Sequence, residues 1–293
     1  MTGQREWDRH DVRRRRRQAG RRRLLGLLAV AALVVVGGVV AWRVARDPAP
    51  APATVPAPTP LTFPEGLRRE DMARLLDEKT NLSGQEYLDL TKPGPDGARL
   101  AGRTAATSLE GFLFPATYGI GRDTTVAFLV DRQVQAYEMN LATVDMSDAR
   151  SKNLTPYDVL IIASMVEREV VVPSERATVA GVIYNRLRNR MRLDIDATVQ
   201  YAVGAWRPLT AADLTSDSPY NTRRFPGLPP GPISNPGLAS LRAAAHPRRS
   251  KYLYYVARQD GTHRHYFART IEEFDQLKAK ARANAAARPP STP

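Results

Sequence analysis

The feature that most restricts how this chain can fold is an apolar run near its start, Leu24 to Trp42, in which 19 consecutive residues carry no charge. At about 1.5 Å of rise per residue, a helix of that length matches the roughly 30 Å hydrocarbon core of a bilayer. Eight arginines lie in the 11 residues before the run, whereas only Arg43 and Arg46 closely follow it. The positive-inside rule therefore predicts a single-pass helix in the cytoplasmic (inner) membrane at residues 24–42. Residues 1–23 would form a basic cytoplasmic tail, and the remainder would be extracytoplasmic.

A cleaved signal peptide is the competing interpretation of the same segment. Its apolar part would be shorter, and a small-x-small cleavage site would follow it. Ala29-Val30-Ala31 fits that pattern but lies inside the run, and Trp42-Arg43 at the end of the run does not resemble a cleavage site. The pattern favours the anchor.

The formal net charge of +13 is unevenly distributed. Residues 1–23 hold ten arginines against three acidic residues, which gives +7, so the other 270 residues carry only +6. Basic residues beside a membrane helix are explained by topology and anionic lipids, and we expect no nucleic-acid partner. The absence of cysteine excludes disulfides, thiolate catalysis and cysteine-ligated zinc.

Low-complexity segments flank the central part of the chain. Residues 47–60 alternate Pro with small residues and favour polyproline II, which at ~3.1 Å per residue predicts a semi-rigid stalk (43–62) reaching on the order of 40 Å. The Ala/Pro-rich residues 282–293 predict a disordered tail.

The roughly 220 residues between the stalk and the tail are enough for one good-sized domain. The clearest helix start has Thr155 as cap, Pro156 at the first position and Asp158 at the third. Other helices are predicted over 67–79 and 83–90, after caps at Asp123, Ser174 and Thr270, and a hairpin over 252–267 around Asp260-Gly261. Residues 215–237 predict a long functional loop. The fold class is therefore α+β: the membrane helix, then a helix-rich domain with a small antiparallel sheet.

One side chain in the helix after Thr155 indicates chemistry. Glu167 projects from a helix that is otherwise mostly apolar. A carboxyl group against apolar walls has a raised pKa, which suits a general acid at neutral pH. The alternative is that Glu167, together with Arg168 and Glu169, forms the solvated end of the helix.

Two histidines near the end of the chain are weaker candidates. His263 and His265 alternate along the predicted strand, so we expect both on one face. No third ligand lies nearby in sequence, so we predict that the two histidines are ordinary side chains of the hairpin, with no metal site and no cofactor.

A series of motifs then follows in order along the chain. They are Leu109-Glu-Gly-Phe-Leu-Phe-Pro115, Ala163-Ser-Met-Val-Glu-Arg-Glu169, Val182-Ile-Tyr-Asn-Arg-Leu187, Met191-Arg-Leu-Asp-Ile-Asp-Ala-Thr-Val199, Tyr220-Asn-Thr222, Gly227-Leu-Pro-Pro-Gly-Pro-Ile233 and Asn235-Pro-Gly237. Together they closely resemble the MltG (YceG-like) family of endolytic murein transglycosylases, whose ordered matches run from about residue 63 to 277.

The resemblance implies a lyase that cleaves the MurNAc–GlcNAc β-1,4 bond of peptidoglycan and leaves 1,6-anhydroMurNAc ends. The single catalytic glutamate of the family falls on Glu167. The implied partners are nascent glycan strands, whose length the enzyme would limit, and peptidoglycan synthases. Two alternatives stay open: a hydrolytic muramidase, and a non-catalytic scaffold of cell-wall synthesis.

The same motifs suggest residues that contact substrate. Tyr220 and Asn221 resemble the Tyr-Asn pair of other lytic transglycosylases, although an Asx-turn in the loop explains Asn221 equally well. Further candidates are Asn185, Arg186, Asp196, Thr198, Gln200 and Tyr118. We expect Glu110 to be structural, and Phe112 and Phe114 to fill the core.

The family resemblance also sets the expected domain boundaries. Family members usually carry a LysM-like module before the catalytic region. Here the stalk leads directly to Phe63-Pro-Glu-Gly-Leu67, so we expect a short subdomain at 63–108 with that module truncated, and a catalytic domain at 109–281.

Overall fold

The structure is a computed structural model that describes residues 26–46, 57–93 and 108–287. The chain divides into two units, residues 1–56 and residues 57–293. The predicted basic tail, residues 47–56 of the predicted stalk and the end of the predicted C-terminal tail lie outside the described residues.

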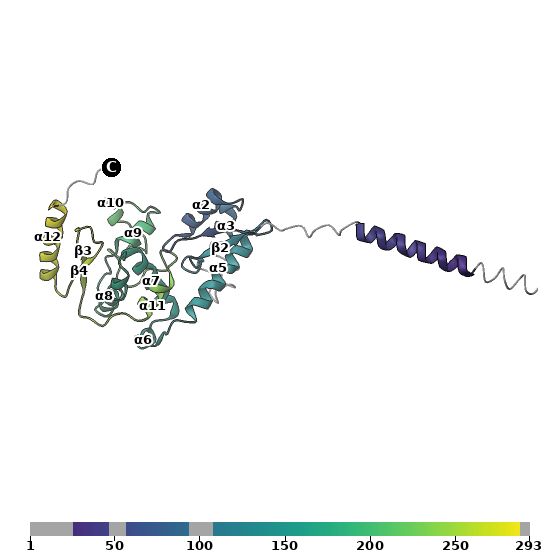
Figure 1. Ribbon diagram of the computed structural model, residues 1–293. Helices are drawn as coiled ribbons and strands as arrows, with labels where there is room; N and C mark the ends of the chain where they lie inside the picture. Colours follow the sequence, from purple (N-terminus) through teal and green to yellow (C-terminus); the bar gives the residue numbers. More distant parts are fainter. Residues whose placement is uncertain (1–25, 47–56, 94–107, 288–293) are drawn as a thin grey trace, which may run out of the picture. The chain divides into compact units, whose positions relative to one another are not determined.

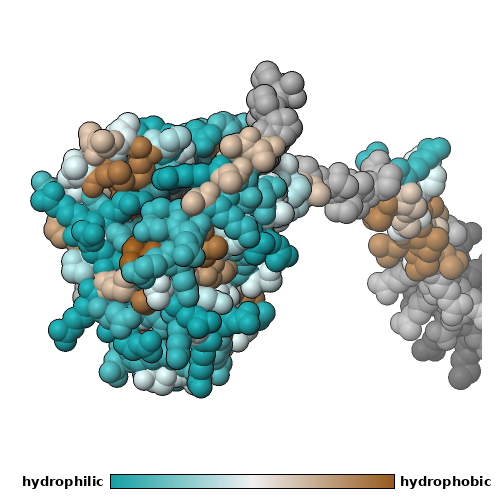
Figure 2. Space-filling view, turned by 90° about the vertical axis from the view of Figure 1, so that its left-hand side faces the viewer, coloured by the Kyte–Doolittle hydropathy of each residue, from teal (hydrophilic) through white to brown (hydrophobic). Residues whose placement is uncertain are grey.

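The first unit contains the helix Gly26–Arg46, whose mean hydropathy reaches 2.3 and whose side chains are all exposed. It is long and apolar enough to cross a membrane, a property that the helix of a signal sequence shares. Its apolar side chains are the brown surface beside the grey segments in Figure 2, in contrast to the mainly hydrophilic face of the second unit in the same view.

Helices predominate in the second unit, and its described strands form two separate antiparallel pairs, β1–β2 and β3–β4 (Figure 1). The helices are α2 (Arg69–Lys79), α3 (Gly84–Thr91), α5 (Val126–Leu141), α6 (Ser147–Arg150), α7 (Pro156–Glu169), the 3₁₀ turn η1 (Pro173–Glu175), α8 (Arg176–Arg188), α9 (Asp196–Ala202), α10 (Ala211–Leu214), α11 (Leu238–Ala245) and α12 (Ile271–Ala287). The strands are β1 (Thr59–Thr62), β2 (Thr117–Ile120), β3 (Tyr254–Ala257) and β4 (His265–Ala268). The predicted α+β class is confirmed, and β3–β4 is the predicted hairpin.

Helix α7 lies at the centre of the larger hydrophobic core. It begins at the predicted cap, because the Thr155 side chain accepts from the Asp158 N–H and the Asp158 carboxylate accepts from the Thr155 N–H. Eight successive residues, Val159 to Val166, are buried, as expected of a helix enclosed on all sides. Helices α8 and α11 pack against it, so α7 supplies a rigid base for whatever its last turn carries.

A second hydrophobic cluster joins strand β1 to helices α2 and α5. Strand β1, which we had assigned to the stalk, pairs with β2 in the register Thr59 to Ile120. This pairing crosses both predicted boundaries, at 62/63 and at 108/109, because the strand partner lies beyond the expected subdomain. The folded unit therefore begins near residue 57 and includes strand β1.

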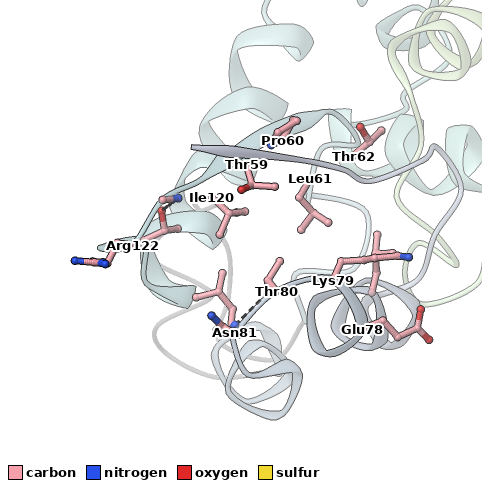
Figure 3. Close-up of a pocket in the computed structure, with 14 residues that line it drawn as sticks. Thr59, Pro60, Leu61, Thr62, Glu78, Lys79, Thr80, Asn81, Ile120 and Arg122 are labelled. Atoms are coloured by element: carbon pink, nitrogen blue, oxygen red, sulfur yellow. Dashed lines mark hydrogen bonds between the residues drawn. The ribbon is translucent and has the colours of Figure 1, made fainter. Parts of the chain in front are cut away.

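A pocket of about 970 Å³ opens between this strand pair and the C-terminal end of α2. Figure 3 shows Leu61 and Ile120 on its strand side and Lys79, Thr80 and Asn81 on its helix side. None of the residues to which the sequence assigned a role lines it.

Two predicted helix starts differ from the structure. Helix α5 is capped by Thr125 and not by Asp123, because the chain first makes a turn in which Gly121 N–H donates to the Thr124 hydroxyl. Ser174 lies within the 3₁₀ turn, and the α-helix begins only at Arg176.

One buried amide ties distant segments together beneath the end of α7. The Asn235 Nδ2 donates to the Leu67 carbonyl at 3.0 Å and to Glu110 Oε1 at 2.8 Å, and its Oδ1 accepts from Leu113 N–H at 3.0 Å. The Asn235 backbone adds two bonds of 2.9 Å, to Gly66 N–H and to the Leu67 carbonyl. The predicted structural role of Glu110 agrees with this geometry.

We expect Asn235→Ala to lower the free energy of unfolding by roughly 2–4 kcal/mol, because it leaves several buried polar groups without partners. Denaturant titration of the full-length chain in detergent measures the loss. Asn81→Ala, at an exposed position, is the matched control and should change stability by less than about 0.5 kcal/mol. Equal effects of the two substitutions would contradict the role of Asn235.

Glu110 should make stability depend on pH. Burial, and then repulsion from Glu70, raises its pKa from 4.5 to about 8. The stabilisation that the protonated Glu110 gives the folded chain is therefore fully present below pH 4.5 and is lost as the pH rises towards 8. The reason is that the unfolded chain already loses this proton near pH 4.5, whereas the folded chain keeps it until about pH 8. Glu110→Gln cannot titrate, so the wild type should lose stability relative to this variant between pH 5 and 8. A difference that stays constant over that interval would contradict the assignment.

Candidate functional site

The carboxylate of Glu167 lies in the last turn of α7, with only 7 % of the side chain exposed. Its Oε2 accepts from the Gly237 N–H at 3.0 Å, and its Oε1 lies 3.7 Å from Nη2 of Arg176. The sequence predicted apolar walls around this group. The structure instead gives it a polar donor and a cation, because loop 215–237 and the start of α8 meet the end of α7.

The two partners of Glu167 are a backbone N–H donor and a cation. Gly237 is the N-cap of α11, so its N–H belongs to the positive end of a helix. Arg176 begins α8 and is itself only 14 % exposed. Within the described residues, the buried Nε atoms of Arg176 and Arg168 lack a hydrogen-bond partner. Buried donors without partners are rare in folded proteins.

The alternative of a solvated helix end does not fit the structure. The Arg168 guanidinium lies over the Trp206 ring, 3.9 Å from its centroid, and donates to the Gly66 carbonyl at 3.3 Å. Glu169 Oε2 accepts from the Tyr255 hydroxyl at 2.9 Å, and burial raises the Glu169 pKa. The end of α7 is therefore covered by other segments.

A second carboxylate, which the sequence reasoning missed, belongs to Glu65. A methyl group added to Gly237 would overlap this carboxylate, so the side chain lies directly against the glycine that binds Glu167. Burial, and next repulsion from Glu167, raises the pKa of Glu65, and Arg176 partly offsets the rise. The available signal was the Phe63-Pro-Glu-Gly segment, which we had assigned to a truncated module.

The predicted Tyr-Asn pair divides between two environments. Tyr220 packs on Tyr201, with ring centroids 4.8 Å apart, and lines a pocket of about 330 Å³ together with Tyr157 and Glu110. Asn221 is fully buried and donates to the carbonyls of Leu214, at the end of α10, and Ser216, while its Oδ1 accepts from the Arg223 N–H. That geometry matches the Asx-turn alternative for Asn221.

Asn185 and Arg186 are both buried and hold the chain before β3. Asn185 Nδ2 donates to the carbonyls of Ser250 and Tyr252, each at 2.9 Å. Arg186 donates to the carbonyls of Leu253 and Leu193 and to the carboxylate of Asp194. These contacts use the polar atoms for packing, so we leave both residues out of the substrate set proposed below.

The other predicted contacts also lie in local networks. Thr198 is fully buried and shares a hydrogen bond of 2.9 Å with Thr222, and Gln200 donates to the Arg207 carbonyl. Asp196 is exposed and pairs with Arg223. Tyr118, on strand β2, donates to the Phe114 carbonyl, and burial raises its pKa to about 12. The predicted core position of Phe112 is confirmed, and Phe114 packs against the same core half-buried.

The two histidines do not share a strand face. Strand β4 begins at His265, and His263 precedes it with a φ of 56°, so the predicted alternation is wrong. His265 lies 2.8 Å from Glu175 Oε2 through Nδ1 and is buried. Among the described residues, no group of three His, Asp or Glu side chains is arranged to hold a metal ion.

Comparison with known proteins shows the family to which the chain is similar. Residues 46–280 match the model of the YceG-like family. A protein of Bacillus subtilis named endolytic murein transglycosylase is 32 % identical over 234 residues, and one of Streptococcus pneumoniae with the same name is 38 % identical over 179 residues. These matches cover 75 % and 59 % of this chain but only 64 % and 32 % of the relatives.

A solved structure gives the same result for the fold. The crystal structure of a YceG-like protein from Listeria monocytogenes superimposes with a TM-score of 0.67 at 33 % identity. The match covers 75 % of this chain and 76 % of that one. The matched region includes most of the folded unit, and the chain therefore belongs to the YceG-like family.

Proposed function

We propose that the chain is an endolytic peptidoglycan lytic transglycosylase, a lyase in which Glu167 is both general acid and general base. The observation that carries the proposal is the enclosed Glu167 carboxylate, with a cation at 3.7 Å and a backbone N–H at 3.0 Å. The names of the Bacillus and Streptococcus relatives support the substrate class.

The proposed reaction needs one carboxyl group and consumes no water. Glu167 donates its proton to the oxygen of the MurNAc–GlcNAc bond as the bond between that oxygen and C1 of MurNAc breaks. The C6 hydroxyl of the same MurNAc then bonds to C1, and its proton passes to the Glu167 carboxylate. The product is a 1,6-anhydroMurNAc end, and the carboxyl group is restored.

The surroundings of Glu167 suit the ionised state between these two steps. Arg176 and the Gly237 N–H stabilise the carboxylate after it has given up its proton. Tyr220 is retained in the proposed substrate set because its ring is only half-buried.

The anchor gives the enzyme its proposed place. The helix Gly26–Arg46 includes residues 26–42 of the predicted span, and the arginines before it favour a cytoplasmic N-terminus. An extracytoplasmic domain tethered by a short stalk would meet glycan strands as they leave the membrane. We therefore propose nascent strands as substrate, strand-length control as the role, and peptidoglycan synthases as partners.

Glu167→Gln is nearly isosteric but can neither donate nor recover the proton, so product release from purified sacculi should fall by at least about 100-fold. Glu138→Gln makes the same chemical change at an exposed position on α5 and should leave the rate unchanged. If the Glu167→Gln variant releases product as fast as the wild type, the scaffold alternative replaces the enzyme.

A hydrolytic muramidase is the second candidate, and Glu65 favours it, because hydrolytic glycosidases use two carboxylates. Mass spectrometry of the glycan ends separates the two reactions. We expect anhydro ends, lighter by one water than reducing ends. Reducing ends from digestion by the wild type would establish the muramidase instead.

A further inference from the structure

The surroundings of Glu167 pose a chemical problem that its known partners do not solve. A general acid must carry its proton when the substrate arrives, yet the Arg176 cation and the Gly237 N–H both favour loss of that proton. We propose that Glu65 is a positioning residue, a second negative charge that keeps the Glu167 carboxyl protonated until it meets the glycosidic oxygen. This inference rests on the proposed function.

Two glycines bring the carboxylates of Glu65 and Glu167 together. Gly66 has a φ of 81°, which a glycine adopts without strain, and its N–H donates to the Asn235 carbonyl at 2.9 Å. This turn holds Glu65 in place. On its other side, the Asn235 side chain donates to the Leu67 carbonyl. The Glu65 carboxylate then lies against Gly237, whose N–H holds Glu167.

The charges around Glu167 come from four elements. Arg176 on α8, Arg168 on α7 and the N-terminus of α11 favour the carboxylate form. Glu65, from the segment before α2, opposes them. Glu169 on α7 contributes less negative charge, because it accepts from Tyr255 and burial raises its pKa.

The coupling is visible on the Glu65 side. Glu65 is an exposed residue, yet its pKa is raised by burial of its carboxylate and by the negative charge of Glu167. Electrostatic coupling between two groups is reciprocal, so each carboxylate favours protonation of the other. Without Glu65, the remaining partners would hold Glu167 as a good base and a poor acid.

The test is the pH dependence of product release from purified sacculi by the full-length chain in detergent. Glu65→Gln removes the charge, and the alkaline limb of the rate profile should move to lower pH by about 0.5–1 unit. That shift is about a three- to tenfold loss of rate on the limb, with little change at acidic pH. Glu65→Asp keeps the charge and should retain most of the wild-type profile.

A second variant reaches the same contact without changing any charge. Gly237 has a φ of −77°, so alanine fits the backbone and the N–H to Glu167 remains. The added methyl group must push the Glu65 carboxylate aside. Gly237→Ala should therefore move the alkaline limb in the same direction as Glu65→Gln, whereas Glu138→Gln, which removes one exposed charge on α5, should not move it.

The outcomes separate this inference from the proposed function. An active wild type whose alkaline limb stays in place in both Glu65→Gln and Gly237→Ala overturns the inference alone. Equal loss of activity at every pH in these variants means a structural role for Glu65 and also overturns it. If the wild type produces reducing ends and the Glu65→Gln variant does not, Glu65 is the second carboxylate of a hydrolytic enzyme, and the inference is overturned. A wild type without activity overturns the proposed function and the inference together.

Discussion

The side-chain amide of Asn235 joins three segments that lie far apart in the sequence, and the geometry of the candidate site depends on it. It binds the Leu67 carbonyl, the Glu110 carboxyl group and the Leu113 N–H, and Asn235, Glu110 and Leu113 are buried. Just before it, Ile233 N–H donates to the Ser164 hydroxyl on α7. A buried polar network in which every member has a partner specifies one arrangement of its segments. Here that arrangement places Gly237 two residues further on, against the end of α7.

In the proposed reaction, one carboxylate serves two opposite proton transfers, and this arrangement supplies its partners. Gly237 and Arg176 stabilise the charge that remains when Glu167 has given up its proton. Glu65, delivered by the turn at Gly66, opposes that charge. The surroundings of Glu167 are therefore a balance of opposing charges and not only apolar side chains. Because the groups come from separate segments, a shift of any one would change the balance.

Local signals predicted the framework of this site, and long-range contacts determined its chemistry. Thr155, Pro156 and Asp158 define the start of α7 from neighbouring residues alone, so that helix and the position of Glu167 could be predicted. Glu65 precedes Glu167 by about a hundred residues, and only the folded chain shows that one glycine lies between them. Asn221 remained ambiguous for a different reason: its partners are close in sequence, but a Tyr-Asn motif does not reveal them. Strand β1 was missed because its Pro-rich sequence resembles a linker until its partner β2 is known.

We propose that a glycan strand is cleaved where Glu167, Arg176 and Gly237 meet. A structure of the full-length Glu167→Gln variant with a bound peptidoglycan oligosaccharide tests it most directly. We expect a glycosidic oxygen within about 2.6–3.2 Å of the side chain at position 167. An oligosaccharide bound only in the tyrosine pocket beside Glu110, or in the pocket between β1 and α2, with position 167 untouched, would contradict it.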